Sequence, residues 1–240
     1  MSNIEGNKKY VWYVTYGSNM LRERFMVYIN GGRFRGKGKG QGQGNWKYKP
    51  CNNNSPPLAD KLFPIPYELY YGQKSKTWSY VDIASKETGS EKRICPGVAF
   101  IDADRLDTGT TLGRAYLITE EQFFHIQEQE GSEWYKRVVE MGKDAGGIPY
   151  KTFTGTRRYD YNAPHENYTN IMFEGICETY YPHLTYSRFH RLMGEAIKHL
   201  GKPYVKSKHD ERGKGPNAFD CVWFNVVNLR QTSSCNIKLI

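Results

Sequence analysis

A strongly β-prone run near the start of the chain constrains the fold more than any other segment. Residues 10–16 are all aromatic or β-branched, and such residues favour the pleated backbone of a half-buried strand. Gly17, Ser18 and Asn19 follow, and small polar residues of this kind end a strand in a tight turn. Residues 20–27 then carry apolar side chains at helical spacing. The sequence therefore predicts a strand, a polar turn and a helix in succession.

Short aromatic-rich segments predict further strands along the chain. Tyrosine is unusually frequent, with 19 residues, and aromatic residues make up 15% of the chain. The predicted strands are residues 65–71, 97–101, 112–118, 134–141 and 218–229. Because strands predominate and do not alternate regularly with helices, we expect an α+β fold. Its sheet should be a mixed, partly closed β-barrel with flanking helices.

Two further helices are predicted from capping residues and apolar spacing. Thr119 is a suitable N-cap for a helix that runs to Gln129, and Glu120 and Glu121 lie in its first turn, where the helix dipole favours anions. Residues 182–200 have an apolar stripe at helical spacing, and Gly201 to Pro203 end that helix. We expect a single domain over residues 1–240, with insertions at 31–57 and 79–96 and a C-terminal extension at 202–240.

The positive charge of the chain is concentrated in one segment. The formal net charge is +9, which by itself suggests a nucleic acid or an anionic membrane surface as partner. Residues 31–50 hold six basic and no acidic residues, and without them the balance is 28 basic to 25 acidic residues. Residues 31–44 are rich in glycine and predict a flexible loop. Most of the excess positive charge therefore lies in one predicted insertion, and the rest of the chain is nearly balanced in charge.

Cysteine spacing and hydropathy narrow the class of protein. The five cysteines are widely separated and form no Cys-x-x-Cys pair, so neither a disulfide framework nor a cysteine zinc cluster is indicated. The longest apolar stretches fall well short of the roughly 18 residues of a membrane helix, and the first residues are polar. We expect a soluble, cytoplasmic protein with reduced thiols.

Two features carry residues suited to chemistry. The turn at Tyr16, Gly17, Ser18 and Asn19 joins a strand to a helix, and its backbone N–H groups could form a nest for a carboxylate or an oxyanion. Equally, it could be an ordinary turn or helix cap. The second feature is Gln127-Glu128-Gln129-Glu130-Gly131 at a predicted helix end, where a carboxylate can be turned inward and its pKa raised towards the range useful for proton transfer.

Taken together, these features resemble the gamma-glutamylcyclotransferase-like family. The matching segments run in order along residues 10–201, interrupted at residues 31–57 and 79–96. They are the opening strand with Tyr16 to Met20, Lys76-Thr77-Trp78, the two strands around Gly97 to Phe100 and Leu112 to Tyr116, the Glu-Gln-Glu-Gly element, Tyr135-Lys136-Arg137, and the late helix with Pro182 and Tyr186. One departure is Ile126-Gln127, where the family commonly carries Leu-Asp.

The resemblance implies an activity and a set of site residues. It implies cleavage of a γ-glutamyl amide by its own α-amino group, with release of 5-oxoproline and a free amine and without any cofactor or metal. Glu130 falls on the family's catalytic acid and base, and Tyr16, Gly17, Ser18 and Asn19 fall on its substrate-binding loop. Tyr135 is a secondary substrate contact by the same resemblance, although a core tyrosine is equally consistent with its sequence context.

Three other functions remain open from the sequence. Nucleic-acid binding would use the basic segment 31–49, through Arg33, Arg35, Lys37 and Lys39, with Phe34, Trp46 and Tyr48 to stack on bases. A zinc amidohydrolase or deacetylase would use the six histidines, although none forms a His-Glu-x-x-His or comparable pair. A catalytically silent member of the fold would keep the architecture without the reaction.

Overall fold

The computed structural model describes residues 8–34, 47–82, 92–131, 133–180 and 226–227. The elements are, in order, β1 (Tyr10–Thr15), the 3₁₀ helix η1 (Ser18–Met20), α1 (Arg22–Asn30), β2 (Ala59–Gly72), β3 (Tyr80–Val81), β4 (Arg93–Ile94), β5 (Val98–Thr119), α3 (Glu120–Gln129), β6 (Arg137–Lys143), β7 (Pro149–Thr154), α4 (Glu166–Tyr180) and β8 (Val226–Val227). The fold is α+β, as the sequence predicts.

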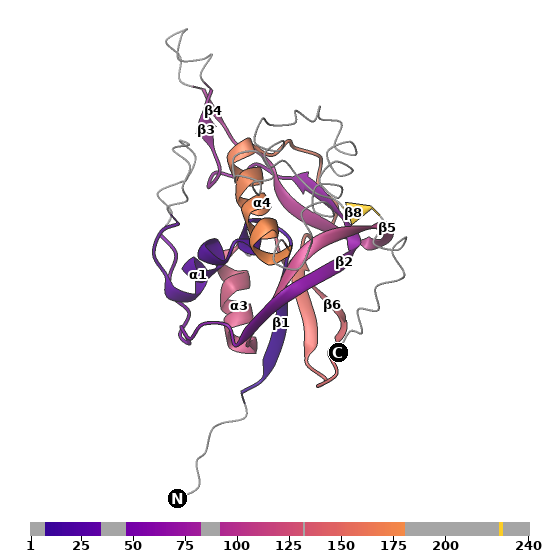
Figure 1. The fold of residues 1–240 in the computed structure, drawn as a ribbon. Coiled ribbons are helices and arrows are strands. Elements are labelled where there is room, and N and C mark those ends of the chain that lie inside the picture. The colour runs from indigo at the N-terminus through magenta and orange to yellow at the C-terminus, as the bar shows by residue number, and fades with distance from the viewer. Residues whose placement is uncertain (1–7, 35–46, 83–91, 132, 181–225, 228–240) are drawn as a thin grey trace, which may run out of the picture.

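One curved sheet organises the domain. Its strands lie in the order β2-β5-β1-β7-β6, and β8 pairs with β5 off this path. Only the β1–β7 pair is parallel along this path, so the sheet is mixed. Figure 1 shows the long β2 and β5 sweeping diagonally across the molecule, with α1 and α3 on one side of β1 and α4 lying across the sheet. β1 is therefore a central strand, and its residues Val11 to Val14 are buried.

Two strands predicted separately, at residues 97–101 and 112–118, are in fact one strand of 22 residues, β5. It pairs antiparallel with the 14-residue β2 along most of its length, with register shifts around Tyr67. The residues between the two predicted strands are mostly polar and include Asp102 and Asp104, and within this stretch β2 pairs with β5 at Asp102, Leu106 and Thr111. β2 also begins earlier than predicted; it forms one edge of the path, where Pro64 and Pro66 are tolerated.

The first half of β5 returns to the far side of the sheet and partly closes the barrel. The Thr154 hydroxyl, at the end of β7, donates to the Ile101 carbonyl at 2.8 Å and accepts the Ile101 N–H at 3.2 Å. Arg137 of β6 forms an ion pair with Asp104 of β5 at 2.7 Å. Side chains thus join strands β5, β6 and β7 where no backbone ladder does, and the partly closed mixed barrel is confirmed.

The helices differ from expectation in their details. The N-cap predicted at Thr119 is present, and in the structure it is part of a capping box: the Thr119 hydroxyl accepts the Gln122 N–H, and the Gln122 side chain accepts the Thr119 N–H. α1 begins at Arg22 rather than at Met20, because Ser18 to Met20 first form a 3₁₀ turn. α4 is not predicted by the sequence pattern. The predicted helix at 182–200, and the predicted extension at 202–240 apart from Val226 and Val227, lie outside the described residues.

The prediction of a strand at 134–141 is wrong at its start. β6 begins only at Arg137, because Trp134 and Tyr135 belong to the turn that follows α3, where both their N–H groups donate to the Gly131 carbonyl. β7 is also absent from the strands predicted by the sequence. Its residues Pro149 to Thr154 alternate less clearly between apolar and polar, yet Thr152, Phe153 and Thr154 are all buried, since β7 lies between β1 and β6.

Candidate functional site

The polar turn predicted after the first strand is held rigidly at the end of β1. The Met20 N–H donates to the Gly17 carbonyl at 3.1 Å, which closes the 3₁₀ turn of η1. From the neighbouring β5, the Tyr116 hydroxyl donates to the carbonyls of Asn19 and Met20 at 3.2 Å each, and Arg114 Nη1 donates to the Met20 carbonyl at 3.1 Å. The backbone of η1 is therefore fixed by buried groups of the barrel.

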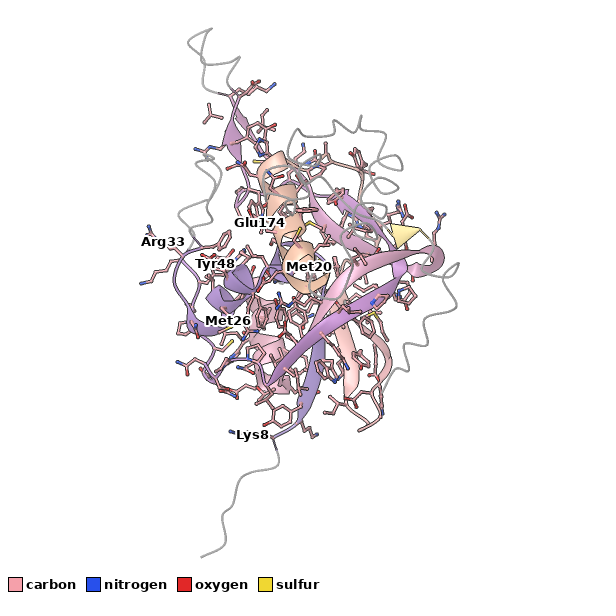
Figure 2. The ribbon with its side chains drawn as sticks, in the orientation of Figure 1. Lys8, Met20, Met26, Arg33, Tyr48 and Glu174 are labelled. Carbon is pink, nitrogen blue, oxygen red and sulfur yellow. The ribbon has the colours of Figure 1, made fainter. Side chains whose placement is uncertain are left out.

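α4 closes over the same turn. Gly175 allows the helix backbone to approach closely, since a Cβ there would lie 2.3 Å from the Leu21 nitrogen. Figure 2 shows Met20 against this helix. Nearer the start of α4, the Tyr168 hydroxyl accepts the Ala99 N–H at 3.0 Å and also hydrogen-bonds the Ser18 backbone. Part of the nest expected at Gly17 to Asn19 is therefore engaged by a tyrosine of α4.

Glu130 lies at the C-terminal end of α3. Its N–H donates to the Ile126 carbonyl at 2.9 Å, and Gly131 then takes a positive φ of 96°, which ends the helix. Two other glutamates lie near this helix end: Glu128 is exposed, and Glu133 is exposed and paired with Lys136 at 3.1 Å. Glu130 alone is directed towards η1.

The turn and the carboxylate meet. Asn19 Nδ2 donates to Glu130 Oε1, although the two residues are 111 positions apart in sequence. The Tyr28 side chain, on α1, also hydrogen-bonds the Glu130 carboxyl group. Burial raises the pKa of Glu130, while the charge of Arg24 and the hydrogen bonds from Tyr28 and Asn19 oppose that rise. The carboxyl group is thus both desolvated and hydrogen-bonded, as a proton-transfer group needs to be.

These residues line one cavity of about 400 Å³. Its wall includes Glu130, the turn from Tyr16 to Asn19, and the segment Lys74 to Trp78 that the sequence singled out in part. Trp78 packs edge-on against Tyr168, with ring centroids 4.9 Å apart. A cavity of this size is sufficient for a small molecule. All the site residues predicted from the sequence therefore lie around one space.

The predicted tyrosines line the cavity through groups that already have partners. The Tyr16 hydroxyl donates to the Phe153 carbonyl at 2.7 Å, and the Tyr135 hydroxyl donates to the Ala99 carbonyl at 2.9 Å. Burial raises the pKa of both hydroxyls, so they are neutral donors. Tyr135 also stacks on Phe100, with ring centroids 4.8 Å apart. Both residues are consequently part of the core as well as of the cavity wall.

Sequence reasoning missed three residues of the site, Arg24, Tyr28 and Tyr168. Arg24 and Tyr28 project from α1 into the cavity, and both are buried. A charged residue on the predicted apolar face of residues 20–27 was the available signal for Arg24. Tyr168 comes from α4, which the sequence did not reveal, so no comparable signal pointed to it.

The described residues contain no group of three or more His, Cys, Asp or Glu side chains placed to hold a metal ion. His125 and His165 are the histidines within the described ranges, and neither lines the cavity. Of the basic residues considered for nucleic-acid binding, Arg33 is exposed, on the same side of the molecule as α1 (Figure 2). Arg35, Lys37 and Lys39 lie outside the described residues. Within the described ranges, no helix has the length and apolarity needed to span a bilayer.

The chain was compared with family models, with curated proteins and with solved structures. No family model matches the chain. Histone deacetylase 5 of Arabidopsis thaliana is 26% identical over 209 residues, which cover 70% of this chain but only 28% of that protein. A solved structure of a gamma-glutamyl cyclotransferase is similar with a TM-score of 0.46 and 17% identity, over 85% of this chain and 97% of the solved one.

Proposed function

We propose that the chain is a gamma-glutamylcyclotransferase-type enzyme. It would cleave a γ-glutamyl amide by intramolecular attack of the α-amino group and release 5-oxoproline and a free amine. The observation that carries the proposal is the contact of Glu130 with Asn19 at the cavity, because it unites a carboxyl group of raised pKa with the polar turn. The resemblance described from the sequence assigns these same residues to one site.

The substrate supplies its own nucleophile in this reaction. The α-nitrogen attacks the γ-carbonyl carbon, a five-membered ring forms, and the bond from that carbon to the leaving nitrogen breaks. Holding the substrate in a folded conformation makes the attack intramolecular and supplies much of the rate. Two protons must pass from the α-nitrogen to the leaving nitrogen. Glu130 accepts the first from the α-ammonium group and donates it to the departing amine, and the restored carboxylate then carries the second from the ring nitrogen to the released amine, which leaves as an ammonium group. One carboxyl group is sufficient for both steps.

The surroundings of Glu130 suit an ammonium group. Asn19 Oδ1 is buried and has no hydrogen-bond partner among the described residues, while Nδ2 of the same amide is held by the carboxylate. An unpaired acceptor beside a carboxylate offers an ammonium group two oxygens at once. Because burial raises the pKa of Glu130, the group retains an abstracted proton more readily than an exposed carboxylate does.

The turn is placed to hold the other end of the reacting group. Backbone N–H groups of Gly17 to Asn19 that Tyr168 does not engage would stabilise a carboxylate or the oxyanion that develops on the γ-carbonyl. Gly17 allows the Tyr168 hydroxyl to approach the turn closely, because a Cβ at this position would lie only 3.0 Å from it. We further propose that Tyr135 contacts the substrate with its ring and that the cytoplasm is the site of action.

Replacing the proton acceptor tests the proposal. Glu130→Gln keeps the shape of the side chain but removes its basicity, so release of 5-oxoproline should fall by about 10² to 10⁴-fold. The matched control is Glu128→Gln, an exposed position on the same helix, which should keep wild-type activity. Activity would be followed over a panel of γ-glutamyl amino acids, peptides and amines. Undiminished turnover by Glu130→Gln, or no 5-oxoproline from any compound with the wild type, contradicts the proposal.

A further inference from the structure

Arg24 is a buried cation that the proposed reaction does not use. It lies on α1, is only 3% exposed, and lines the same cavity as Glu130. Among the residues that the structure describes, no carboxylate forms an ion pair with its guanidinium group. Burying a charge without a partner is unfavourable, so a buried arginine at a cavity wall requires an explanation.

Aromatic residues hold the guanidinium group in place. Arg24 Nη2 donates to the hydroxyls of Tyr28 at 2.8 Å and Tyr48 at 2.6 Å. The guanidinium carbon also lies 4.7 Å from the ring centroid of Tyr28, 4.5 Å from that of Tyr48 and 5.7 Å from that of Phe34. These contacts fix the direction of the guanidinium fork, formed by Nη1 and Nη2, before any ligand binds, so the Arg24 side chain loses little conformational freedom on binding.

The second terminal nitrogen of the guanidinium group, Nη1, is buried and makes no hydrogen bond to the described residues. Glu130, an acid of the same cavity, interacts with the charge of Arg24 but forms no ion-pair contact with its guanidinium group, and its carboxylate is hydrogen-bonded by Asn19 and Tyr28. A fixed, unpaired guanidinium nitrogen is suited to an anion with planar oxygens, and a carboxylate fits that geometry best.

The remaining charges around the cavity also favour an anion. Lys74 and Lys76 are exposed and line the same space. Glu133, the other acid of the wall, is engaged by Lys136 at 3.1 Å. Positive groups therefore exceed free negative groups along the wall, which attracts anionic ligands.

We propose that Arg24 is the anion receptor of the cavity and that its Nη1 donates to a carboxylate of the bound ligand. The inference rests on the proposed function, in which the ligand is a γ-glutamyl compound. Such a compound carries an α-carboxylate, and it carries a second carboxylate when the amine to be released is an amino acid. Arg24 thereby becomes a residue that determines which compounds bind.

Direct binding tests the receptor without requiring turnover. Calorimetry would compare glutarate, a dicarboxylate, with glutaramide, its neutral diamide. Wild-type protein should prefer glutarate, and Arg24→Met should weaken glutarate binding by about 10- to 100-fold while changing glutaramide binding little. Arg33→Met is the matched control, since Arg33 is exposed on the same side of the molecule, and it should bind as the wild type does. Lys76→Met measures the contribution of the exposed lysines.

Several results would overturn the proposal. The first is a wild-type protein that does not bind glutarate or does not prefer it to glutaramide. The second is an Arg24→Met variant that binds glutarate as the wild type does. The third is an Arg24→Met variant whose affinities for glutarate and glutaramide fall equally. Should Arg24→Met not fold, Arg24→Lys keeps the charge but loses the fork, and it should still weaken glutarate binding by about tenfold. These measurements need no 5-oxoproline release, so failure of the receptor and failure of the proposed reaction are distinguishable.

Turnover then identifies which carboxylate is bound. γ-Glutamylalanine carries a carboxylate on the released amine, whereas γ-glutamylethylamide does not. An Arg24→Met variant that loses kcat/KM equally for both compounds indicates the α-carboxylate. Loss confined to γ-glutamylalanine indicates the carboxylate on the amine side. Unchanged kcat/KM for both contradicts the assignment.

Discussion

Gly175→Ala, at the contact of α4 with η1, should have two opposite effects on stability. In the interior of a helix, alanine is more favourable than glycine by about 1 kcal/mol, so the change should stabilise an isolated α4. In the protein, however, the added Cβ would lie 2.3 Å from the Leu21 nitrogen, 2.4 Å from the Met20 carbonyl carbon and 2.7 Å from Met20 Cβ. All three atoms belong to η1 or the residue after it, and two of them are backbone atoms that cannot rotate away.

The magnitude follows from these distances. Ordinary contacts of a Cβ begin at 3.4 Å, so α4 and η1 must separate by about 1 Å. Overpacking costs about 1–3 kcal/mol, and the short contacts with two backbone atoms put this case in the upper part of that range, at about 2–3 kcal/mol, of which the gain in helix propensity offsets about 1 kcal/mol. We therefore expect a net loss of about 1–2 kcal/mol in the free energy of unfolding. Because η1 carries Asn19, a shift of about 1 Å should also lower turnover by about 100-fold.

Thermal unfolding and 5-oxoproline release measure the two consequences. At roughly 2–4 °C per kcal/mol for a chain of this size, Tm should fall by about 2–8 °C. Asn170→Ala, at a partly buried position of the same helix, is the control and should leave both quantities near their wild-type values. If Gly175→Ala raised Tm, or if turnover were unchanged, the close approach of α4 to η1 would not control the site.

Two further predictions concern the cavity. Burial raises the pKa of Glu130, so the stability contributed by its protonated form is fully present below the pKa of the unfolded chain and is lost as pH rises through the folded pKa. Glu130→Gln should therefore gain stability relative to the wild type as pH rises above about 4, the ordinary pKa of a glutamate. Urea unfolding across this range checks it, and a difference that does not vary with pH refutes it. Tyr168→Phe leaves the buried Ala99 N–H without its acceptor and should cost about 1–3 kcal/mol, whereas Tyr161→Phe, at a residue 73% exposed, should cost nothing measurable by thermal unfolding.

Local signals predicted the elements that begin and end within a few residues. The β1 run, the Thr119 cap and the Glu130-Gly131 helix end each depend on neighbours in sequence, and the structure has all three. The α+β class followed from the same signals. The candidate site was foreseeable for a different reason, because the order of the motifs resembled a known family rather than because any motif was specific by itself.

Long-range pairing was not predictable in the same way. The strand continues through the polar middle of β5, which pairs with β2 at Asp102, Leu106 and Thr111, and nothing within Asp102 to Asp104 indicates a strand. The role of α4 depends on Gly175, which packs against Met20 and Leu21, more than 150 residues earlier in the sequence. The hydrogen bond from the Arg22 N–H to Glu178 spans a similar separation of 156 residues. Arg24 was missed because its significance lies in the tyrosines around it, one of them 24 residues away.

The position of β1 also has a consequence for how the chain is made. Its neighbours in the sheet are β5, through Arg114 to Thr119, and β7, through Tyr150 and Lys151. During synthesis at about 5–20 residues per second, this apolar strand emerges before β5 and β7 and waits several seconds for the residues that will cover it. Until then its backbone and side chains are open to aggregation or to a chaperone. The strand that positions the site in the finished protein is thus the segment of the nascent chain most in need of protection.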